Sequence, residues 1–338
     1  MFVGEADGME RELVTRAGIP FQAICAGAMH GVGARRALRG AWRTLSGSGQ
    51  ALRILRAFKP HVVFMTGGFV GVPVALAAWL RRVPSVAYLP DIEPGYALRL
   101  MAHLATRVAV TAEDSAAFIP KRKMVMTGYP VREAFANLSR TSARRHFGLS
   151  EAERVVLIYG GSKGARSINR AVLTALPDLL AAATVIHVTG KADWAEVSAA
   201  RAGLSEALRR RYLAFDYLHD EMALAMAAAD LAVCRAGASV LGELPYLGLP
   251  AILVPYPYAW RYQQVNADYL ARRGAAVVLR DDQLLDERAG LRRCVNDLLN
   301  HPDRLEAMRR ASQQLGHRDG AARIAALLLE VSHGHDQR

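Results

Sequence analysis

The sequence predicts an α/β fold of two Rossmann-like domains, each built on a parallel sheet. Three observations carry this prediction: short runs of β-branched and apolar residues recur along the 338-residue chain, helical patterns separate them, and two of the runs end in a Gly-Gly turn. Short buried strands that alternate with helices favour βαβ units. At roughly 150 residues per domain, the length also predicts two domains.

The strand patterns place the domain boundary near residue 150. The stretch 136–153 is polar and has no strand pattern, and a new apolar strand follows it directly. We therefore expect domains at 1–150 and 151–338, with the ligand beyond the carboxyl ends of the strands, in a cleft that the two domains face. The clearest strand patterns lie at His61–Thr66, Val83–Tyr88, Val108–Thr111, Val155–Tyr159, Thr184–Thr189, Leu231–Cys234 and Ala251–Pro255, and helical patterns at Ala165–Ala182 and Tyr217–Ala229.

Composition excludes several classes of protein. With 52% hydrophobic and 22% charged residues, the chain does not have the composition of a disordered protein. The three cysteines (Cys25, Cys234 and Cys294) lie far apart, so a disulfide scaffold and a zinc module are not expected, and a reducing compartment fits best. No apolar run reaches the roughly 18–20 residues of a membrane span, and the first residues lack the pattern of a signal peptide.

The charge is strongly basic and unevenly distributed. A net charge of +12 suits an anionic partner: nucleic acid, a phosphorylated substrate or an acidic membrane. No acidic residue lies between Glu12 and Asp91, a span that holds ten arginines and lysines. No nucleic-acid-binding motif accompanies them, so nucleic acid is not an expected partner. Large apolar residues recur beside these cations at near-helical spacing: Leu38, Trp42, Leu45, Leu52 and Leu55. This pattern indicates either a surface that docks on anionic lipid or a solvated arginine-rich helix whose leucines face the core.

The first candidate site is GGSKGA, residues 160–165, between a strand and a helix. Glycines allow a ligand to approach the backbone, and the free N–H groups at the start of a helix favour phosphate oxygens. Ser162 adds a hydroxyl and Lys163 a positive charge. The alternative is a tight turn that binds nothing.

Two further candidates follow. In ADLAVCRAGASVLGELPYLGLPAILVPYP (229–257), a strand ends at Cys234, a glycine turn follows, and Glu243 stands early in the next helix. A carboxylate there can accept hydrogen bonds from ribose hydroxyls, although a surface helix residue is the alternative. Gln263 and Gln264 come next, and side-chain amides suit sugar hydroxyls, although such a pair is also common on solvated helices.

These motifs, in this order and spacing, resemble the MurG family, the UDP-N-acetylglucosamine:lipid-linked muramyl-pentapeptide transferases of peptidoglycan synthesis, which have the two-domain GT-B fold. The resemblance covers nearly the whole chain and includes FVGEADGMERELVTRAGIPF, GGFVGVPVALAAWLRRVP and GYPVREAF. It implies an inverting transfer of N-acetylglucosamine (GlcNAc) from UDP-GlcNAc to a lipid-linked acceptor, by a peripheral enzyme on an anionic membrane at its cytoplasmic face. No metal or cofactor is expected.

The resemblance also implies a role for each matching residue. The first domain would serve the acceptor and the membrane, and the second would bind the UDP-sugar. The implied positions are Gly160, Gly161 and Ser162 on the diphosphate, Leu218 with its backbone at uracil, Glu243 on the ribose, Gln263 and Gln264 on the GlcNAc hydroxyls, Arg235 and Gly237 in the donor turn, and Arg132, Asp91 and Gly95 on the acceptor side.

The chain departs from the family pattern in two places. The family begins with a strand and a GGGTGGH loop, and this sequence starts after them, so we expect an N-terminally incomplete first sheet and a start codon assigned too far downstream. The catalytic base is therefore not assigned, and neither His30 nor His219 is marked for that role. Where the family has HEQN before a glycine, this chain has Tyr88–Asp91 and then Gly95, with Asp91 in place of Asn. Transfer to another lipid acceptor, or UDP-sugar binding without catalysis, are the alternatives.

Overall fold

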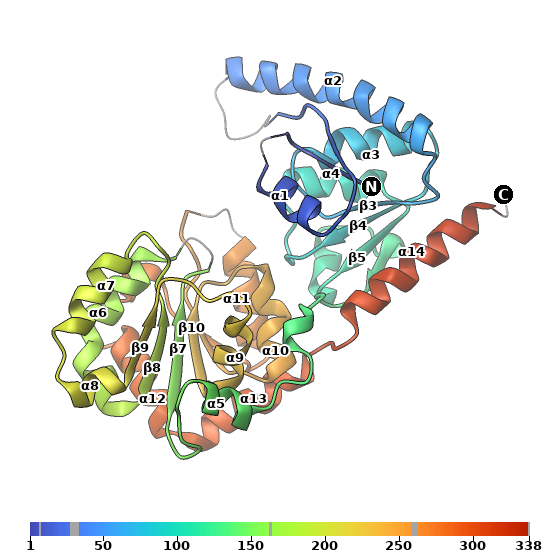
Figure 1. Cartoon of the computed structure of the whole chain (residues 1–338). Coiled ribbons are helices and arrows are strands. Elements are labelled where there is room, and N and C mark those ends of the chain that lie inside the picture. Colours follow the sequence, from blue (N-terminus) through green and yellow to red (C-terminus); the bar gives the residue numbers. More distant parts are fainter. Residues whose placement is uncertain (7, 28–33, 162–163, 259–261, 337–338) are drawn as a thin grey trace. The chain divides into compact units, whose positions relative to one another are not determined.

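The computed structural model describes residues 1–6, 8–27, 34–161, 164–258 and 262–336, and its chain forms two compact units (Figure 1). Unit 1 comprises Met1–Thr127 with Ala321–Arg338, and unit 2 comprises Gly128–Gly320. The predicted boundary near residue 150 therefore lies inside unit 2, and the last helix belongs to unit 1. The polar stretch 136–153 contains a helix that packs within unit 2, for the reason given below.

Unit 2 is built on a six-stranded parallel sheet in the order β12-β11-β10-β7-β8-β9. All five residues of β7 and of β8 are buried, as expected for strands covered by helices on both faces. On one face, α6 and α12 pack against each other and against side chains of the central strands. The strands are β7 (Val155–Tyr159), β8 (Thr184–Val188), β9 (Tyr212–Phe215), β10 (Leu231–Cys234), β11 (Ala251–Leu253) and β12 (Ala276–Val278).

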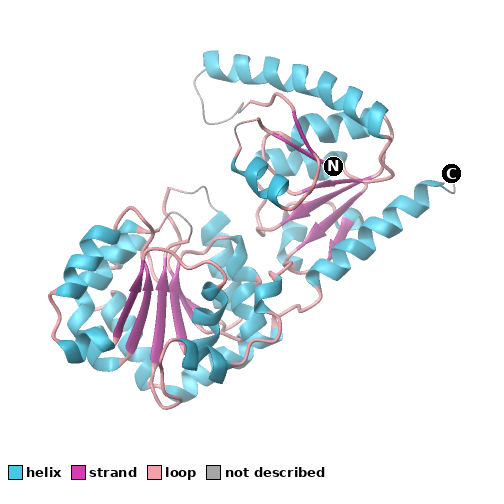
Figure 2. Cartoon of the chain, viewed as in Figure 1, coloured by secondary structure: helices cyan, strands magenta, loops and turns pink. Residues whose placement is uncertain are grey.

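The helices of unit 2 surround this sheet (Figure 2). They are α5 (Arg140–His146), α6 (Arg166–Ala182), α7 (Trp194–Ala202), α8 (Glu206–Arg210), α9 (Glu221–Ala228), α10 (Glu243–Leu247), α11 (Tyr262–Arg272), α12 (Leu291–Asn300) and α13 (Pro302–Gln314), with short 3-10 helices at Glu133–Phe135, Ala238–Leu241 and Asp281–Gln283.

A buried arginine explains why α5 belongs to unit 2. Arg144 is fully buried and donates from Nη1 to the carbonyls of Ser150, Glu151 and Glu153 at 2.7–2.9 Å. Its Nη2 donates to Asp230, immediately before β10, at 2.9 Å. These bonds hold α5 and the following loop against the sheet, because a buried guanidinium needs every one of its partners.

Unit 1 holds a four-stranded parallel sheet, order β3-β4-β5-β6, and a separate parallel pair β1-β2. Among the described residues, β3 pairs only with β4 and β1 only with β2, so both are edge strands. The strands are β1 (Phe2–Gly4), β2 (Phe21–Ala23), β3 (Val63–Met65), β4 (Ser85–Leu89), β5 (Arg107–Val110) and β6 (Met124–Met126). The helices are α1 (Met9–Arg16), α2 (Ala34–Phe58), α3 (Gly71–Leu80), α4 (Tyr96–Leu104) and α14 (Gly320–Asp336), with 3-10 helices at Glu113–Ala117 and Lys121–Lys123.

Helix α2 has both core-facing leucines and exposed apolar side chains, so each interpretation of its sequence pattern applies to part of the helix. Leu55 is buried and Leu52 half-buried, so these two leucines face the core. Trp42 is 73% exposed and Leu45 is 63% exposed, beside the exposed Arg43. In the part of the chain that the structure describes, no helix is both long enough and apolar enough to cross a bilayer.

Candidate functional site

The strand order of unit 2 predicts where a ligand binds. From β7 the chain runs outward through β8 and β9, and it then returns to the other side of β7 and runs through β10, β11 and β12. In open α/β sheets, ligands bind at the carboxyl ends of the strands where this direction reverses. Here that point lies between β7 and β10, whose carboxyl ends lead directly into Gly160-Gly161 and Arg235–Gly237.

The turn after β7 requires its glycines for folding. A Cβ at Gly160 would lie 2.2 Å from the Ala165 nitrogen, and one at Gly164 would lie 2.3 Å from the Thr189 carbonyl oxygen. Gly161 has φ = +86°, in the left-handed region. The turn delivers the chain into α6 at Arg166, so the first N–H groups of that helix lie at the carboxyl edge of the sheet. Ser162 and Lys163 lie outside the described residues.

Gly237, after β10, differs from these glycines. Its φ is −66°, a value that any residue adopts, and no heavy atom lies within 4 Å of a Cβ added to it. The fold therefore has no steric need for glycine at this position. Open space beside the backbone at the strand-order reversal is what a closely approaching ligand would use.

Glu243 is a buried carboxylate at the same edge. It is the first residue of α10, and its side chain is only 11% exposed, which argues against the surface-residue alternative. Burial raises its pKa, while Arg132, at 3.4 Å, and a hydrogen bond with Ser239 act in the opposite direction. A carboxylate that retains unfilled acceptor capacity in a buried position is suited to binding hydroxyl groups.

Arg235 fixes the donor turn, the turn after β10 at residues 235–237, through contacts with other parts of unit 2. Its guanidinium donates to Asp281 Oδ1 at 2.6 Å, to Ser167 Oγ at 2.8 Å and to the Val254 carbonyl at 3.2 Å. It also lies over the Tyr256 ring, 5.2 Å from the centroid. These contacts tie the end of β10 to the start of α6 and to the loop after β12, so the structure gives Arg235 a positioning role.

The remaining residues expected on the donor side also lie near carboxyl ends of strands. Gln263 and Gln264 begin α11, where Gln263 Oε1 accepts from the Tyr256 N–H at 2.9 Å and Gln264 donates to Asp268 at 2.8 Å. Leu218 is buried in the loop between β9 and α9. Gln263 thus shares the edge next to β10, whereas Leu218 follows β9, two strands away from β7.

In unit 1, Asp91 and Gly95 lie in the loop that follows β4, and Gly95 immediately precedes α4. The same loop holds a residue that sequence reasoning missed. Glu93 is 8% exposed; Oε1 accepts from Arg99 at 3.0 Å, and among the described residues Oε2 is buried without a hydrogen-bond partner. Only its burial singles it out, since one acidic residue in a polar loop carries no sequence signal. His219 is exposed against Tyr217, and His30 lies outside the described residues.

The described residues contain no group of three or more His, Cys, Asp or Glu side chains arranged to hold a metal ion. The donors assembled at the carboxyl edge are instead backbone N–H groups, a carboxylate and side-chain amides. That set suits hydroxyl and phosphate groups.

Comparison with known proteins identifies the family. Residues 155–324 match the sequence model of the glycosyltransferase family 28 C-terminal domain, and residues 1–110 match that of the family 28 N-terminal domain. A relative from Roseiflexus sp. (strain RS-1) is 41% identical over 97% of this chain and 82% of its own length, and one from Moorella thermoacetica is 39% identical over 99% and 91%. Both are named UDP-N-acetylglucosamine--N-acetylmuramyl-(pentapeptide) pyrophosphoryl-undecaprenol N-acetylglucosamine transferase.

Solved structures support the fold. MurG from Acinetobacter baumannii aligns with a TM-score of 0.74 at 23% identity, covering 97% of this chain and 90% of that one. UDP-GlcNAc 2-epimerase from Neisseria meningitidis, bound to UDP-GlcNAc, aligns with a TM-score of 0.63 at 14% identity, covering 95% and 94%. The predicted GT-B-type α/β fold with parallel sheets is thus confirmed. The chain belongs to glycosyltransferase family 28 and, within it, to the MurG family that its motifs indicate.

Proposed function

We propose that this chain transfers GlcNAc from UDP-GlcNAc to undecaprenyl-diphosphate-linked N-acetylmuramyl-pentapeptide. The observation that carries the proposal is the buried carboxylate of Glu243 at the strand-order reversal of unit 2, beside the open glycine turn at Gly237. Family relatives at 35–41% identity over nearly the whole chain bear the name of this reaction.

In this proposal the donor lies along the carboxyl edge of the unit 2 sheet. Backbone N–H groups at Gly160-Gly161 and the start of α6 hold the diphosphate. Glu243 accepts hydrogen bonds from the ribose hydroxyls, and the backbone at Leu218 meets uracil. The amides of Gln263 and Gln264 exchange their present partners, Tyr256 N–H and Asp268, for sugar hydroxyls.

The reaction is a single displacement at the anomeric carbon. A bond forms between the acceptor hydroxyl oxygen and that carbon as the bond to the UDP oxygen breaks, and a base takes the hydroxyl proton. The departing UDP carries a new negative charge, which the N–H groups of the glycine turn and the α6 N-terminus stabilise. Because the reaction is a single displacement, the configuration at the anomeric carbon is inverted.

We also propose that unit 1 docks on an anionic membrane through α2. An acceptor anchored in lipid requires the enzyme to work at a membrane surface. The exposed Trp42 and Leu45 can enter the headgroup region while Arg43 meets the anionic headgroups. The proposal therefore includes work at the cytoplasmic face of that membrane, where a nucleotide-sugar donor is available.

A second candidate is transfer to a different lipid acceptor, such as a diacylglycerol. The loop after β4 favours it, because Tyr88–Asp91 replaces the family's HEQN. The donor chemistry is the same under both candidates, so only the acceptor distinguishes them.

The test is transfer of radiolabelled GlcNAc from UDP-GlcNAc into lipid, measured in vesicles that contain either acceptor. We expect labelled product with the muramyl-pentapeptide lipid, and its loss in Glu243→Gln. Labelled product with diacylglycerol, and none with the muramyl-pentapeptide lipid, would establish the second candidate. Binding of UDP-GlcNAc without product from either acceptor would contradict a transferase function.

A further inference from the structure

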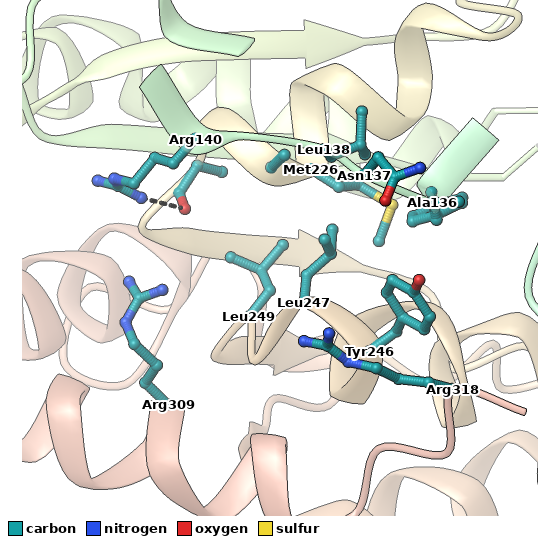
Figure 3. Close-up of a pocket in the computed structure, with 13 residues that line it drawn as sticks. Ala136, Asn137, Leu138, Arg140, Met226, Tyr246, Leu247, Leu249, Arg309 and Arg318 are labelled. Carbon is teal, nitrogen blue, oxygen red and sulfur yellow. Dashed lines mark hydrogen bonds between the residues drawn. The ribbon is translucent and has the colours of Figure 1, made fainter. Parts of the chain in front are cut away.

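A cavity in unit 2 lies at the amino ends of β10 and β11, the ends opposite the edge proposed for the donor. Figure 3 shows the residues that line it. Ala229, which precedes β10 by two residues, and Leu249, which precedes β11 by two, belong to its wall. The cavity encloses about 320 Å³, within the lower range of small-molecule sites. No step of the proposed transfer uses it.

One end of the cavity concentrates positive charge. Arg140 and Arg309 line it, and the buried Arg144 lies behind them. All three guanidinium groups converge on Asp230: Arg140 and Arg144 at 2.5 and 2.9 Å, and Arg309 at 3.8 Å. One carboxylate therefore serves three cations. Two further carboxylates lie near these arginines: Glu306, 3.5 Å from Arg309, is 55% exposed and shared with Arg310, and Glu153 has its pKa lowered in part by Arg144.

Arg309 is the cation best placed to bind a ligand. Its side chain is 24% exposed, and no hydrogen bond joins its guanidinium to another group in the described part of the chain. Burial lowers its pKa most, Arg140 and Arg144 lower it further, and Asp230 and Glu306 act in the opposite direction. An anion received here would meet donors that are held in place yet not saturated.

The other end of the cavity carries an aromatic platform and a further cation. The Arg318 guanidinium lies 5.4 Å from the centroid of the Tyr246 ring, and Phe135 meets that ring edge-on at 6.3 Å. Within the described residues, Arg318 has no hydrogen bond or ion pair. Apolar side chains (Leu138, Met226, Leu247 and Leu249) line the space between the two ends, and Figure 3 shows Asn137 beside Arg318's end.

We propose that this cavity binds a small organic phosphate. Its phosphate group lies between Arg140 and Arg309, and its organic part covers the apolar wall toward Tyr246 and Arg318. The two guanidinium groups supply the forked N–H donors that match phosphate oxygens. None of the residues that line the cavity is among those proposed to bind the donor.

Calorimetric titration of the full chain with phenyl phosphate tests the proposal, with phenol as the neutral probe and inorganic phosphate as the bare anion. We expect phenyl phosphate to bind more tightly than inorganic phosphate, and phenol not to bind. In Arg309→Met the affinity for phenyl phosphate should fall about tenfold or more, as expected for a lost charge-assisted contact. Arg310→Met is the matched control, since Arg310 is the next residue on α13 and its side chain is 68% exposed; it should bind as the wild type does.

A phosphate monoester could also come from a lipid headgroup, so dihexanoyl phosphatidic acid is titrated below its micelle concentration. Binding of phenyl phosphate but not of this lipid assigns the site to a soluble molecule, whereas binding of the lipid alone would overturn that assignment. Thermal unfolding checks that Arg309→Met folds, and Arg318→Gln, at the exposed end, supplies a second variant that should weaken binding. If phenyl phosphate does not bind to the wild type, or if it binds to Arg309→Met and Arg310→Met with equal affinity, the proposal is overturned.

Discussion

At the scale of single residues, two of the described glutamates stand out by their burial. Glu243 and Glu93 are each about nine-tenths buried and each is paired with one arginine. Such positions cost stability unless every charge is compensated, and they are therefore typical of binding sites. The buried position of Glu243 has a consequence for the pH dependence of folding.

We expect Glu243→Gln to be more stable than the wild type at neutral pH. Because the pKa of Glu243 is raised above its ordinary 4.5, the native state holds this proton more tightly than the unfolded chain does. The wild type therefore loses stability relative to the variant as the pH rises from 4.5 through the raised pKa. Urea unfolding at pH 4.5 and pH 7.5 measures the two free energies. If the stability difference between the variant and the wild type is the same at both pH values, the raised pKa of Glu243 is contradicted.

Gly237→Ala is expected to fold normally and to bind UDP less tightly. An added methyl meets no protein atom, so the thermal midpoint should stay at the wild-type value. In the bound state the methyl would occupy space needed by the ligand, at a cost of about 1–3 kcal/mol in binding free energy. Gly203→Ala, at the end of α7, is the control. Unchanged affinity for UDP in calorimetry would show that the ligand does not approach Gly237.

At the scale of elements, α5 depends on one buried side chain. Arg144→Met removes four carbonyl contacts, one from Nε to Ala228 and three from Nη1, and one of the cations around Asp230. We expect a loss of about 3–5 kcal/mol in the free energy of unfolding, the usual cost of breaking a buried charged network. The neighbouring Arg145 is exposed, and Arg145→Met should stay within about 0.5 kcal/mol of the wild type. Equal urea midpoints for the two variants would disprove the structural role of Arg144.

The central strands could be predicted from sequence, whereas the outer ones could not. Val155–Tyr159 and Leu231–Cys234 have the predicted bounds, since a strand buried on both faces is a continuous apolar run. The missed strands β1, β2, β6, β9 and β12 have three or four residues each and are only partly buried, so their pattern is weak. The boundary was missed because the burial of Arg144 inside a polar stretch depends on Asp230, 86 residues later.

The candidate site likewise contains some features that the sequence predicts and others that it does not. Glycine turns and Glu243 could be found from local motifs, because the chemistry lies in consecutive residues. The burial of Glu93 and the arginine-lined cavity arise only when separate segments meet; the cavity combines the loop before α5 with α10, α13 and the loop after α13. Arg235 lies in the turn after β10 as expected, but its four partners come from the loop after β11 (Val254 and Tyr256), the start of α6 (Ser167) and the 3-10 helix after β12 (Asp281).

At the scale of the whole molecule, the basic charge of +12 is expected to serve membrane docking. Replacing both Trp42 and Leu45 with alanine should weaken binding to phosphatidylglycerol vesicles about tenfold, since two large exposed side chains no longer enter the lipid. Cosedimentation measures the bound fraction. Leu285→Ala, an equally exposed leucine in unit 2, is the control and should bind normally. Undiminished vesicle binding by the double variant would assign docking to another surface.

The central claim is that the carboxyl edge of the unit 2 sheet binds the UDP-sugar. Titration of UDP-GlcNAc into the wild type, Glu243→Gln and Arg309→Met tests it most directly. We expect binding by the wild type, a loss of about 1–3 kcal/mol in Glu243→Gln from the hydrogen bonds to ribose, and wild-type affinity in Arg309→Met, which lies at the opposite ends of the strands. Equal affinity in Glu243→Gln and the wild type, or no binding by the wild type, would contradict the claim.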